Sequence, residues 1–246
     1  MLTLTNIQKT FAPGTVNEKK ALCGIDLHLE AGDFVTVLGS NGAGKSTLFG
    51  AIAGSFRPDT GTVVLDGQNI TNMPDYRRSK CIGRLFQDPL RGTAPSMTIA
   101  ENLALAYLRA GHGRSPFSTI TKKDRAEFRD RLAALELGQR QALTLLMATL
   151  VTPKLLLLDE HTAALDPATA EKVLELTKKI VAENHITCLM ITHNVPSALA
   201  LGNRTVMMKD GRIVLELAGA QRANMTPEDL LKAFHVESDR MLFSAE

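Results

Sequence analysis

A glycine-rich stretch between an apolar run and a helix-forming run constrains the fold of this chain more than any other feature. The apolar run at 34–38 suits a strand buried on both faces, and residues 45–53 favour a helix that stops at Gly54. The stretch satisfies G-x-x-x-x-G-K-[ST] with Gly39, Ser40, Asn41, Gly42, Ala43, Gly44, Lys45, Ser46 and Thr47. Glycines let a backbone wrap an anion, and a helix N-terminus attracts it. We therefore expect a phosphate-binding loop, the alternative being a glycine-rich turn without a ligand.

This loop assigns roles to two side chains and calls for a second motif. Lys45 would reach the β- and γ-phosphates, and Ser46 would offer its hydroxyl to Mg²⁺. Downstream, four leucines at 155–158 lead into Asp159 and Glu160, adjacent carboxylates at the end of a buried strand. Asp159 would hold Mg²⁺, and Glu160 would orient or deprotonate a water. The alternative is an ordinary strand end.

Composition excludes several classes of protein. The chain has 246 residues, about 1.6 domains at ~150 residues per domain. No apolar run reaches the ~18–20 residues that span a bilayer, and the first residues lack a signal-peptide pattern, so we expect a soluble chain. The net charge of +2 argues against a nucleic-acid partner. Three separated cysteines, Cys23, Cys81 and Cys188, fit buried thiols in a reducing compartment.

Apolar periodicity predicts strands that alternate with helices, and hence a mainly parallel sheet. A helical block from about 89 to 150 interrupts the alternation and suggests an inserted subdomain. One face of the helix at 168–183 should carry Val173, Leu176, Thr177 and Ile180. The expected strands are 2–7, 25–29, 34–38, 62–65, 82–86, 155–158 and 186–191; the other expected elements are a helical stretch over 98–150 with a break at 111–118, a short helix after 191, a hairpin around 209–211 and a helix near 227–235.

With both motifs placed, the chain resembles the ATP-binding subunits of ABC transporters from about residue 2 to 236. Four further positions follow the family's order, and the resemblance implies a role for each. Gln87 would sense Mg²⁺ and the attacking water and face the membrane subunit, and Asp166 would belong to the loop after the carboxylates. His193 would contact the γ-phosphate, and Phe11 would stack on adenine. Taken singly, Gln87 could be a surface residue, His193 a polar strand end and Phe11 part of the core.

His161 stands where most of the family has proline. Together with residues 87–95, it resembles a subgroup that accompanies bacterial importers, some of which handle amino acids. For His161 itself, a hydrogen bond within the loop is favoured over a metal-binding role.

The family's signature, Leu-Ser-Gly-Gly-Gln, is altered. Gln139 lies 159 − 139 = 20 residues before Asp159, which sets the register, and Gly138 precedes it; both would contact nucleotide. Glu136 replaces the signature serine, and Leu137 replaces its first glycine. The preceding linker looks about 15–20 residues short of the family's usual spacing. Residues 122–150 could then run as one helix, without a free N-terminus for a phosphate.

Three explanations of the altered signature stay open. The linker was deleted or left out of this sequence, the gene carries a natural deletion, or the subunit is degenerate. The first is favoured because the other catalytic positions are intact. The resulting hypothesis is that this chain binds Mg-ATP but hydrolyses it poorly.

The resemblance implies an α/β P-loop NTPase fold with a RecA-like core, an antiparallel β subdomain and a shortened helical subdomain. The core would comprise 1–87 and 151–246, and the helical subdomain 88–150. It also implies an ATPase that pairs with a second copy or another ATPase subunit. Two transmembrane permease subunits and a substrate-binding protein would complete an importer at the cytoplasmic face of the membrane. The alternatives are a hydrolysis-impaired subunit, a soluble non-transport ABC ATPase and a P-loop kinase.

Overall fold

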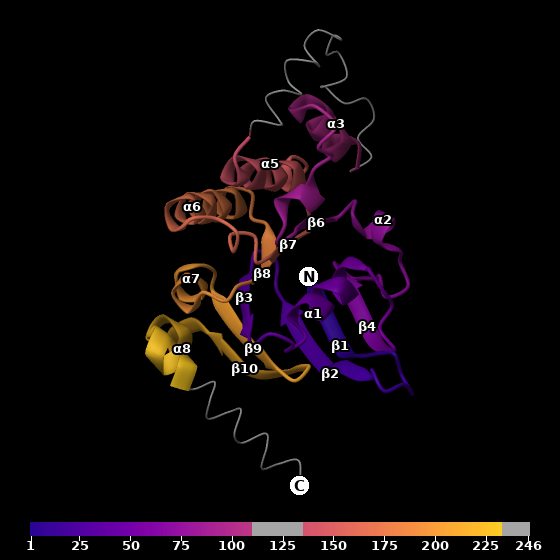
Figure 1. Cartoon of the computed structure of the whole chain (residues 1–246). Helices are drawn as coiled ribbons and strands as arrows, with labels where there is room; N and C mark the ends of the chain where they lie inside the picture. Colours follow the sequence, from indigo (N-terminus) through magenta and orange to yellow (C-terminus); the bar gives the residue numbers. More distant parts are fainter. Residues whose placement is uncertain (110–134, 233–246) are drawn as a thin grey trace. The chain divides into compact units, whose positions relative to one another are not determined.

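The computed structural model of this chain describes residues 1–109 and 135–232 (Figure 1). The chain forms two compact units, each considered by itself. The first comprises Met1–Arg78 and Thr187–Glu246, and the second comprises Ser79–Ile186. These units differ from the expected division into a catalytic core and a helical subdomain at 88–150, which stays a prediction.

An antiparallel sheet makes up one part of the first unit. Its strands are β1 (Leu2–Phe11), β2 (Lys19–Leu29), β4 (Thr60–Leu65) and β5 (Gln68–Asn69), in the order β2-β1-β4-β5. Ile25, Leu27 and Leu29 are buried while the residues between them are exposed. One face of β2 is therefore buried and apolar, and the other face is exposed to solvent. The expectation of a half-buried strand here is confirmed.

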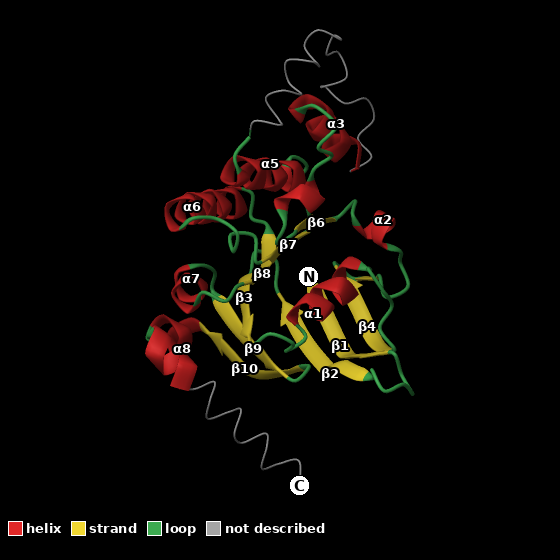
Figure 2. Cartoon of the chain, viewed as in Figure 1, coloured by secondary structure: helices red, strands yellow, loops and turns green. Residues whose placement is uncertain are grey.

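The same unit contains parallel strands. β3 (Phe34–Gly39) pairs in parallel with β8 (Thr187–Ile191) and with β9 (Arg204–Lys209), and β10 (Arg212–Ala218) pairs antiparallel to β9. The helices of this unit, drawn red in Figure 2, are α1 (Lys45–Ala53), α2 (Asp75–Arg78), α7 (Val195–Ala200) and α8 (Gly219–Ala223), and residues 227–232 are also helical. Leu38, Met207 and Leu230 belong to one buried apolar cluster. Because β3 is buried up to Leu38, the glycine-rich loop that follows it begins at a rigid position.

The second unit combines two parallel strands with helices. β6 (Ile82–Leu85) pairs in parallel with β7 (Leu155–Asp159). The helices are the 3₁₀-helix η1 (Pro89–Gly92), α3 (Ile99–Arg109), α5 (Leu137–Thr149) and α6 (Pro167–Glu183). Helix α5 packs against β6, η1, α3 and α6. A Cβ added at Gly83 of β6 would lie 2.9 Å from the carbonyl oxygen of Ala148, so glycine is required for this close approach.

The structure corrects two expectations about helices. The continuous helix expected over 122–150 is wrong, because Leu135 and Glu136 are not helical and α5 begins at Leu137. Residues 122–134 and the break expected at 111–118 lie outside the described residues. The buried face of α6 is also different: Val173, Thr177 and Val181 are buried, whereas Leu176 is 37% exposed. The buried positions recur at every fourth residue, one turn of helix apart.

The remaining expectations concern the cysteines and the membrane. Cys188 is a buried free thiol as expected, and burial raises its pKa, but the free thiols of Cys23 and Cys81 are only partly buried. No helix among the described residues has both the length and the apolarity needed to cross a bilayer.

Candidate functional site

The glycine-rich loop connects β3 to α1 as expected, and its glycines are required by geometry. Gly39 has φ +150°, and a Cβ there would lie 2.3 Å from the carbonyl oxygen of Met208. Gly44 has φ +101°, and a Cβ there would lie 2.5 Å from the carbonyl oxygen of Ala21. Only glycine tolerates both the conformation and the close contact. The loop is therefore a backbone-lined cradle of the kind that phosphate binding requires.

Lys45 and the first turn of α1 supply the positive end of this cradle. The side chain of Lys45 is 5% exposed, and its Nζ donates to the carbonyl oxygens of Gly39 and Ser40 over 2.7 and 3.0 Å. Gly44 is the N-cap of α1, and no side-chain hydrogen bond caps this helix end. The first N–H groups of α1 therefore point out of the helix toward the loop, where an anion is favoured. These observations fit the triphosphate of ATP.

The turn between β9 and β10 supports the loop from behind. The backbone N–H of Gly211 donates to the carbonyl of Ala43 over 3.1 Å, and the N–H of Cys23 donates to the carbonyl of Gly211 over 2.9 Å. Sequence analysis predicted the hairpin at 209–211 but missed this contact. No local pattern could reveal it, because it joins residues 168 positions apart.

Phe11 lies at the end of β1 and is not part of the core. Its side chain is 40% exposed, and its ring meets Phe56 edge to face with the ring centroids 5.4 Å apart. The ammonium of Lys9 lies 5.7 and 5.6 Å from the two ring centroids and is bonded to Asp59 over 2.7 Å. The core alternative for Phe11 is wrong, and adenine stacking stays a prediction.

His193 belongs to the same unit as the cradle. It is exposed, two residues beyond β8, and the next residue, Asn194, is the N-cap of α7. The side chain of Asn194 accepts from the N–H of Ser197 over 2.8 Å. This cap fixes the start of α7 directly after His193.

Asp159 closes β7 in the second unit. The guanidinium Nη2 of Arg84 on β6 lies 3.8 Å from Asp159 Oδ2. Burial lowers the pKa of Arg84, and attraction to Asp159 opposes that effect. The carboxylate of Asp159 thus has a cationic neighbour on the adjacent strand. Sequence analysis did not identify Arg84.

Glu160 adopts a backbone conformation that is rare for its residue type. Its φ is +47°, in the left-handed region. Its carbonyl oxygen accepts from the N–H of Ala163 over 2.9 Å, so the chain turns immediately after β7. Strained backbone of this kind concentrates at functional sites.

His161 is buried directly after Glu160, with 2% of its surface exposed. Its Nε2 lies 3.2 Å from the hydroxyl of Thr177 on α6, and burial lowers the pKa of His161 to about 4. Residues 1–109 and 135–232 contain no group of three or more His, Cys, Asp or Glu side chains that could hold a metal ion. The expected hydrogen bond of His161 is present, but its partner is Thr177 on α6 and not a residue of the loop.

The altered signature forms the start of α5. Glu136 is the N-cap, with φ −64° and ψ 161°, and its backbone N–H donates to Gln139 Oε1 over 3.1 Å. A Cβ added at Gly138 would lie 2.2 Å from Cγ2 of Thr169, so glycine permits close packing of α5 on α6. The expectation that this region has no helix terminus is wrong. This region still differs from the family signature in its side chains. A carboxylate stands at the N-cap, and the side chain of Leu137 is 42% exposed.

Gln87 and Asp166 lie in loops of the second unit. Gln87 is exposed just beyond β6, and Asp88 beside it caps η1 by accepting from the N–H of Leu90 over 2.9 Å. Asp166 is the N-cap of α6 and accepts from the N–H of Thr169 over 3.0 Å, a bond that lowers the pKa of Asp166. The structural role of Asp166 was not predicted, although aspartate followed by proline at the first helical position is a known helix start.

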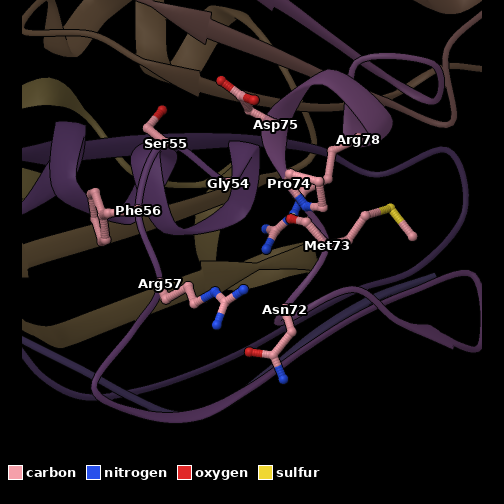
Figure 3. A pocket seen from close by; sticks show the side chains of 9 residues that line it. All are labelled: Gly54, Ser55, Phe56, Arg57, Asn72, Met73, Pro74, Asp75 and Arg78. Atoms are coloured by element: carbon pink, nitrogen blue, oxygen red, sulfur yellow. The ribbon is translucent and has the colours of Figure 1, made fainter.

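A cavity of about 260 Å³ lies at the other end of α1 (Figure 3), lined by Gly54, Ser55, Phe56, Arg57, Asn72, Met73, Pro74, Asp75 and Arg78. Arg78 is 1% exposed and donates to the carbonyls of Ala51 and Ile52 over 2.8 and 2.7 Å. It therefore satisfies the last carbonyls of α1 and complements the helix dipole there. Arg78 therefore holds the helix that follows the cradle, a role that no local sequence pattern indicates.

The sequence profile of the family described as ABC transporter matches residues 22–163, more than half of the chain. The chain belongs to the ABC transporter family. It is 41% identical over 248 residues to a tyrosine transport ATP-binding protein of Clostridioides difficile, covering 95% of this chain and 98% of that protein. It is 34% identical to the lipoprotein-releasing system ATP-binding protein LolD of Ruegeria pomeroyi, covering 87% and 97% of the two chains.

Solved ABC cassettes have the same fold. A dimeric post-hydrolysis structure of the ATP-binding cassette MJ0796, bound to ADP and Pi, superposes with a TM-score of 0.72 at 28% identity, covering 89% of this chain and 98% of that one. The predicted α/β P-loop NTPase fold is confirmed. This ABC protein is an ATP-binding and ATP-hydrolysing subunit that powers transport.

Proposed function

We propose that this chain binds Mg-ATP and powers the import of an amino acid across the cytoplasmic membrane. The observation that carries the proposal is the similarity to a tyrosine transport ATP-binding protein over nearly the full length of both chains. The similarity to LolD is lower in identity and shorter in coverage, which favours the importer over a lipoprotein-releasing system.

The cradle would hold the nucleotide. Phe11 would stack on adenine, and the loop backbone with Lys45 would bind the β- and γ-phosphates. Ser46, Gln87 and Asp159 would hold Mg²⁺ together with phosphate oxygens. Hydroxyl, amide and carboxylate oxygens are the ligands that Mg²⁺ prefers, and it commonly uses one or two carboxylates plus phosphates. The ion would neutralise charge on the β- and γ-phosphates.

Hydrolysis would use Glu160, Lys45 and His193. Glu160 would polarise the attacking water, since a carboxylate can accept its proton. Lys45 and His193 would stabilise the charge that develops on the γ-phosphate. Gln87 would sense Mg²⁺ and the attacking water and would face the membrane subunit.

Assembly would complete the site. Two copies would pair head to tail, so that Gly138, Gln139 and Asp166 of one copy face the nucleotide held by the other. The subdomain at 88–150 would then transmit closure of the dimer to two transmembrane permease subunits. A substrate-binding protein would deliver the amino acid on the far side, and this chain would lie at the cytoplasmic face of the membrane.

A second candidate is a subunit that binds nucleotide but turns it over slowly. The observation that favours it is Glu136 at the N-cap of α5, because its carboxylate would face the γ-phosphate of the paired copy. Like charges that meet across an interface oppose association.

The import proposal can be tested in reconstituted vesicles. The chain would be co-expressed with candidate permease and substrate-binding proteins, and uptake of radiolabelled tyrosine, methionine and bicarbonate would be compared with and without internal ATP. ATP-dependent uptake of an amino acid supports the proposal. Uptake of bicarbonate alone, or export of a preloaded substrate, contradicts it.

A further inference from the structure

The buried hydrogen bond between His161 and Thr177 lies directly after Glu160. His161 is 2% exposed and Thr177 is 0% exposed, in the middle of α6, and both belong to the second unit with Glu160. Nothing in the nucleotide chemistry uses this pair. A buried polar contact between a loop and a helix that serves no ligand calls for an explanation.

The direction of this bond follows from counting protons. Thr177 Oγ1 donates its single proton to the carbonyl of Val173 over 2.8 Å. The hydroxyl can therefore only accept from His161, so Nε2 carries the proton and donates across the 3.2 Å contact. The ring is then the neutral Nε2–H tautomer. The lowered pKa of His161 agrees with a neutral ring.

Glu160 needs support in its observed conformation. A left-handed conformation is unfavourable for a non-glycine residue, so the flanking structure must hold it. On one side β7 fixes the chain through its pairing with β6. On the other side the neighbouring residue, His161, is fastened to α6.

We propose that His161 is the positioning residue for Glu160: its hydrogen bond to Thr177 holds the turn after β7 and thereby sets the direction of the Glu160 carboxylate. The proposal rests on the proposed role of Glu160 in polarising water. A buried donor with one acceptor fixes the position of the loop more closely than apolar packing does, because sliding would leave the Nε2–H of His161 without an acceptor. His161 acts through Glu160 and touches no reacting atom.

Thr177→Val tests the bond with almost no change of volume, and Thr177→Ser keeps the hydroxyl. We expect Thr177→Val to lower kcat about 10-fold with the KM for ATP unchanged, since a small displacement of a catalytic group costs rate rather than affinity. Thr177→Ser should restore kcat to within about twofold. Thr149→Val is the matched control, because Thr149 makes the same bond to the carbonyl four residues earlier, also over 2.8 Å, on α5. An equal loss in Thr149→Val would overturn the proposal.

The Glu160→Gln background separates this inference from the proposed function. If Glu160→Gln leaves turnover unchanged, the role of Glu160 fails. If it lowers turnover to a small measurable rate and Thr177→Val then lowers that rate no further, the two residues act together. If kcat is the same in Thr177→Val and Thr177→Ser, the positioning role of His161 is overturned and the proposed role of Glu160 is unaffected. The ¹³Cα shift of Glu160 provides a readout that needs no turnover: Thr177→Val should move it away from its left-handed value, and an unmoved shift contradicts the proposal.

Discussion

Gly211 donates its backbone N–H to the carbonyl of Ala43 over 3.1 Å, so the turn between β9 and β10 holds the phosphate-binding loop from behind. The same glycine accepts from Cys23 of β2 over 2.9 Å. The turn between β9 and β10 and the strand β2 contribute no residue to the expected nucleotide contacts, yet together they fix the shape of the cradle. The shape of this loop depends on residues distant in sequence.

Gly211→Ala should weaken ATP binding about 5- to 10-fold. Gly211 has φ +74°, and a Cβ there would lie 2.9 Å from the carbonyl of Ala21, so the turn must shift away from the loop. Gly67→Ala is the matched control: Gly67 also follows an aspartate in a turn, has φ +75° and has open space around the added Cβ. Titration with a fluorescent ATP analogue compares the two variants. Equal affinities in the two would contradict the supporting role of Gly211.

Phe11→Ala should weaken ATP binding and lower the melting temperature only modestly. The loss of the edge-to-face contact with Phe56 accounts for the change in melting temperature. Stacking of an aromatic side chain on a base is worth about 1–3 kcal/mol. Phe11→Tyr keeps the ring and should bind ATP as the parent chain does. Calorimetric titration with ATP provides the measurement. Unchanged affinity in Phe11→Ala would show that adenine stacks elsewhere.

Restoring the signature should raise turnover. Glu136→Ser with Leu137→Gly removes a carboxylate and an exposed apolar side chain from the start of α5, and serine is also a good N-cap, so the helix should persist. We expect a rise in phosphate release of about 10-fold or more. Glu136→Gln removes the charge alone and should give part of the gain. If neither variant changes the rate, the altered signature is harmless.

Asp33 supplies a pH-dependent part of the stability. Burial alone would raise the pKa of Asp33, but hydrogen bonds from Asn203 and Arg204, over 2.9 and 2.6 Å, outweigh burial and lower it. A lowered native pKa stabilises the fold above the unfolded value near 4, and this stability is lost as the pH falls through the native pKa. Asp33→Asn should therefore lower the free energy of unfolding by about 2 kcal/mol at pH 7. Denaturant titrations should show the difference shrinking below about pH 4; a constant difference would contradict this.

The sequence predicted the elements that depend on local patterns. The glycine-rich loop, the helix from Lys45 to Ala53 ending at Gly54, and the strand before Asp159 all lie where expected, because their periodicity and terminating residues are local. The start of α5 was mispredicted, because helix-forming residues on both sides of Glu136 concealed a non-helical segment.

Other features depend on contacts that no local pattern shows. The supporting bond from Gly211, the cap that Arg78 provides for α1 and the partner of His161 all join residues distant in sequence. Leu176 was placed on the buried face of α6 because helical periodicity alone cannot tell which side a neighbour covers. The sequence was thus enough to propose which residues form the candidate site, but not which residues hold them in position.

Glu160→Gln gives the most direct test of the central claim, that this chain is an ATP-hydrolysing cassette that works as a pair. The measurement combines phosphate release with the oligomeric state at saturating Mg-ATP for the parent chain, Glu160→Gln and Lys45→Ala. The account predicts that Glu160→Gln releases no phosphate, keeps its affinity for ATP and accumulates as an ATP-bound dimer, whereas Lys45→Ala loses ATP binding and stays monomeric. A Glu160→Gln chain that releases phosphate at the parent rate and stays monomeric would contradict it.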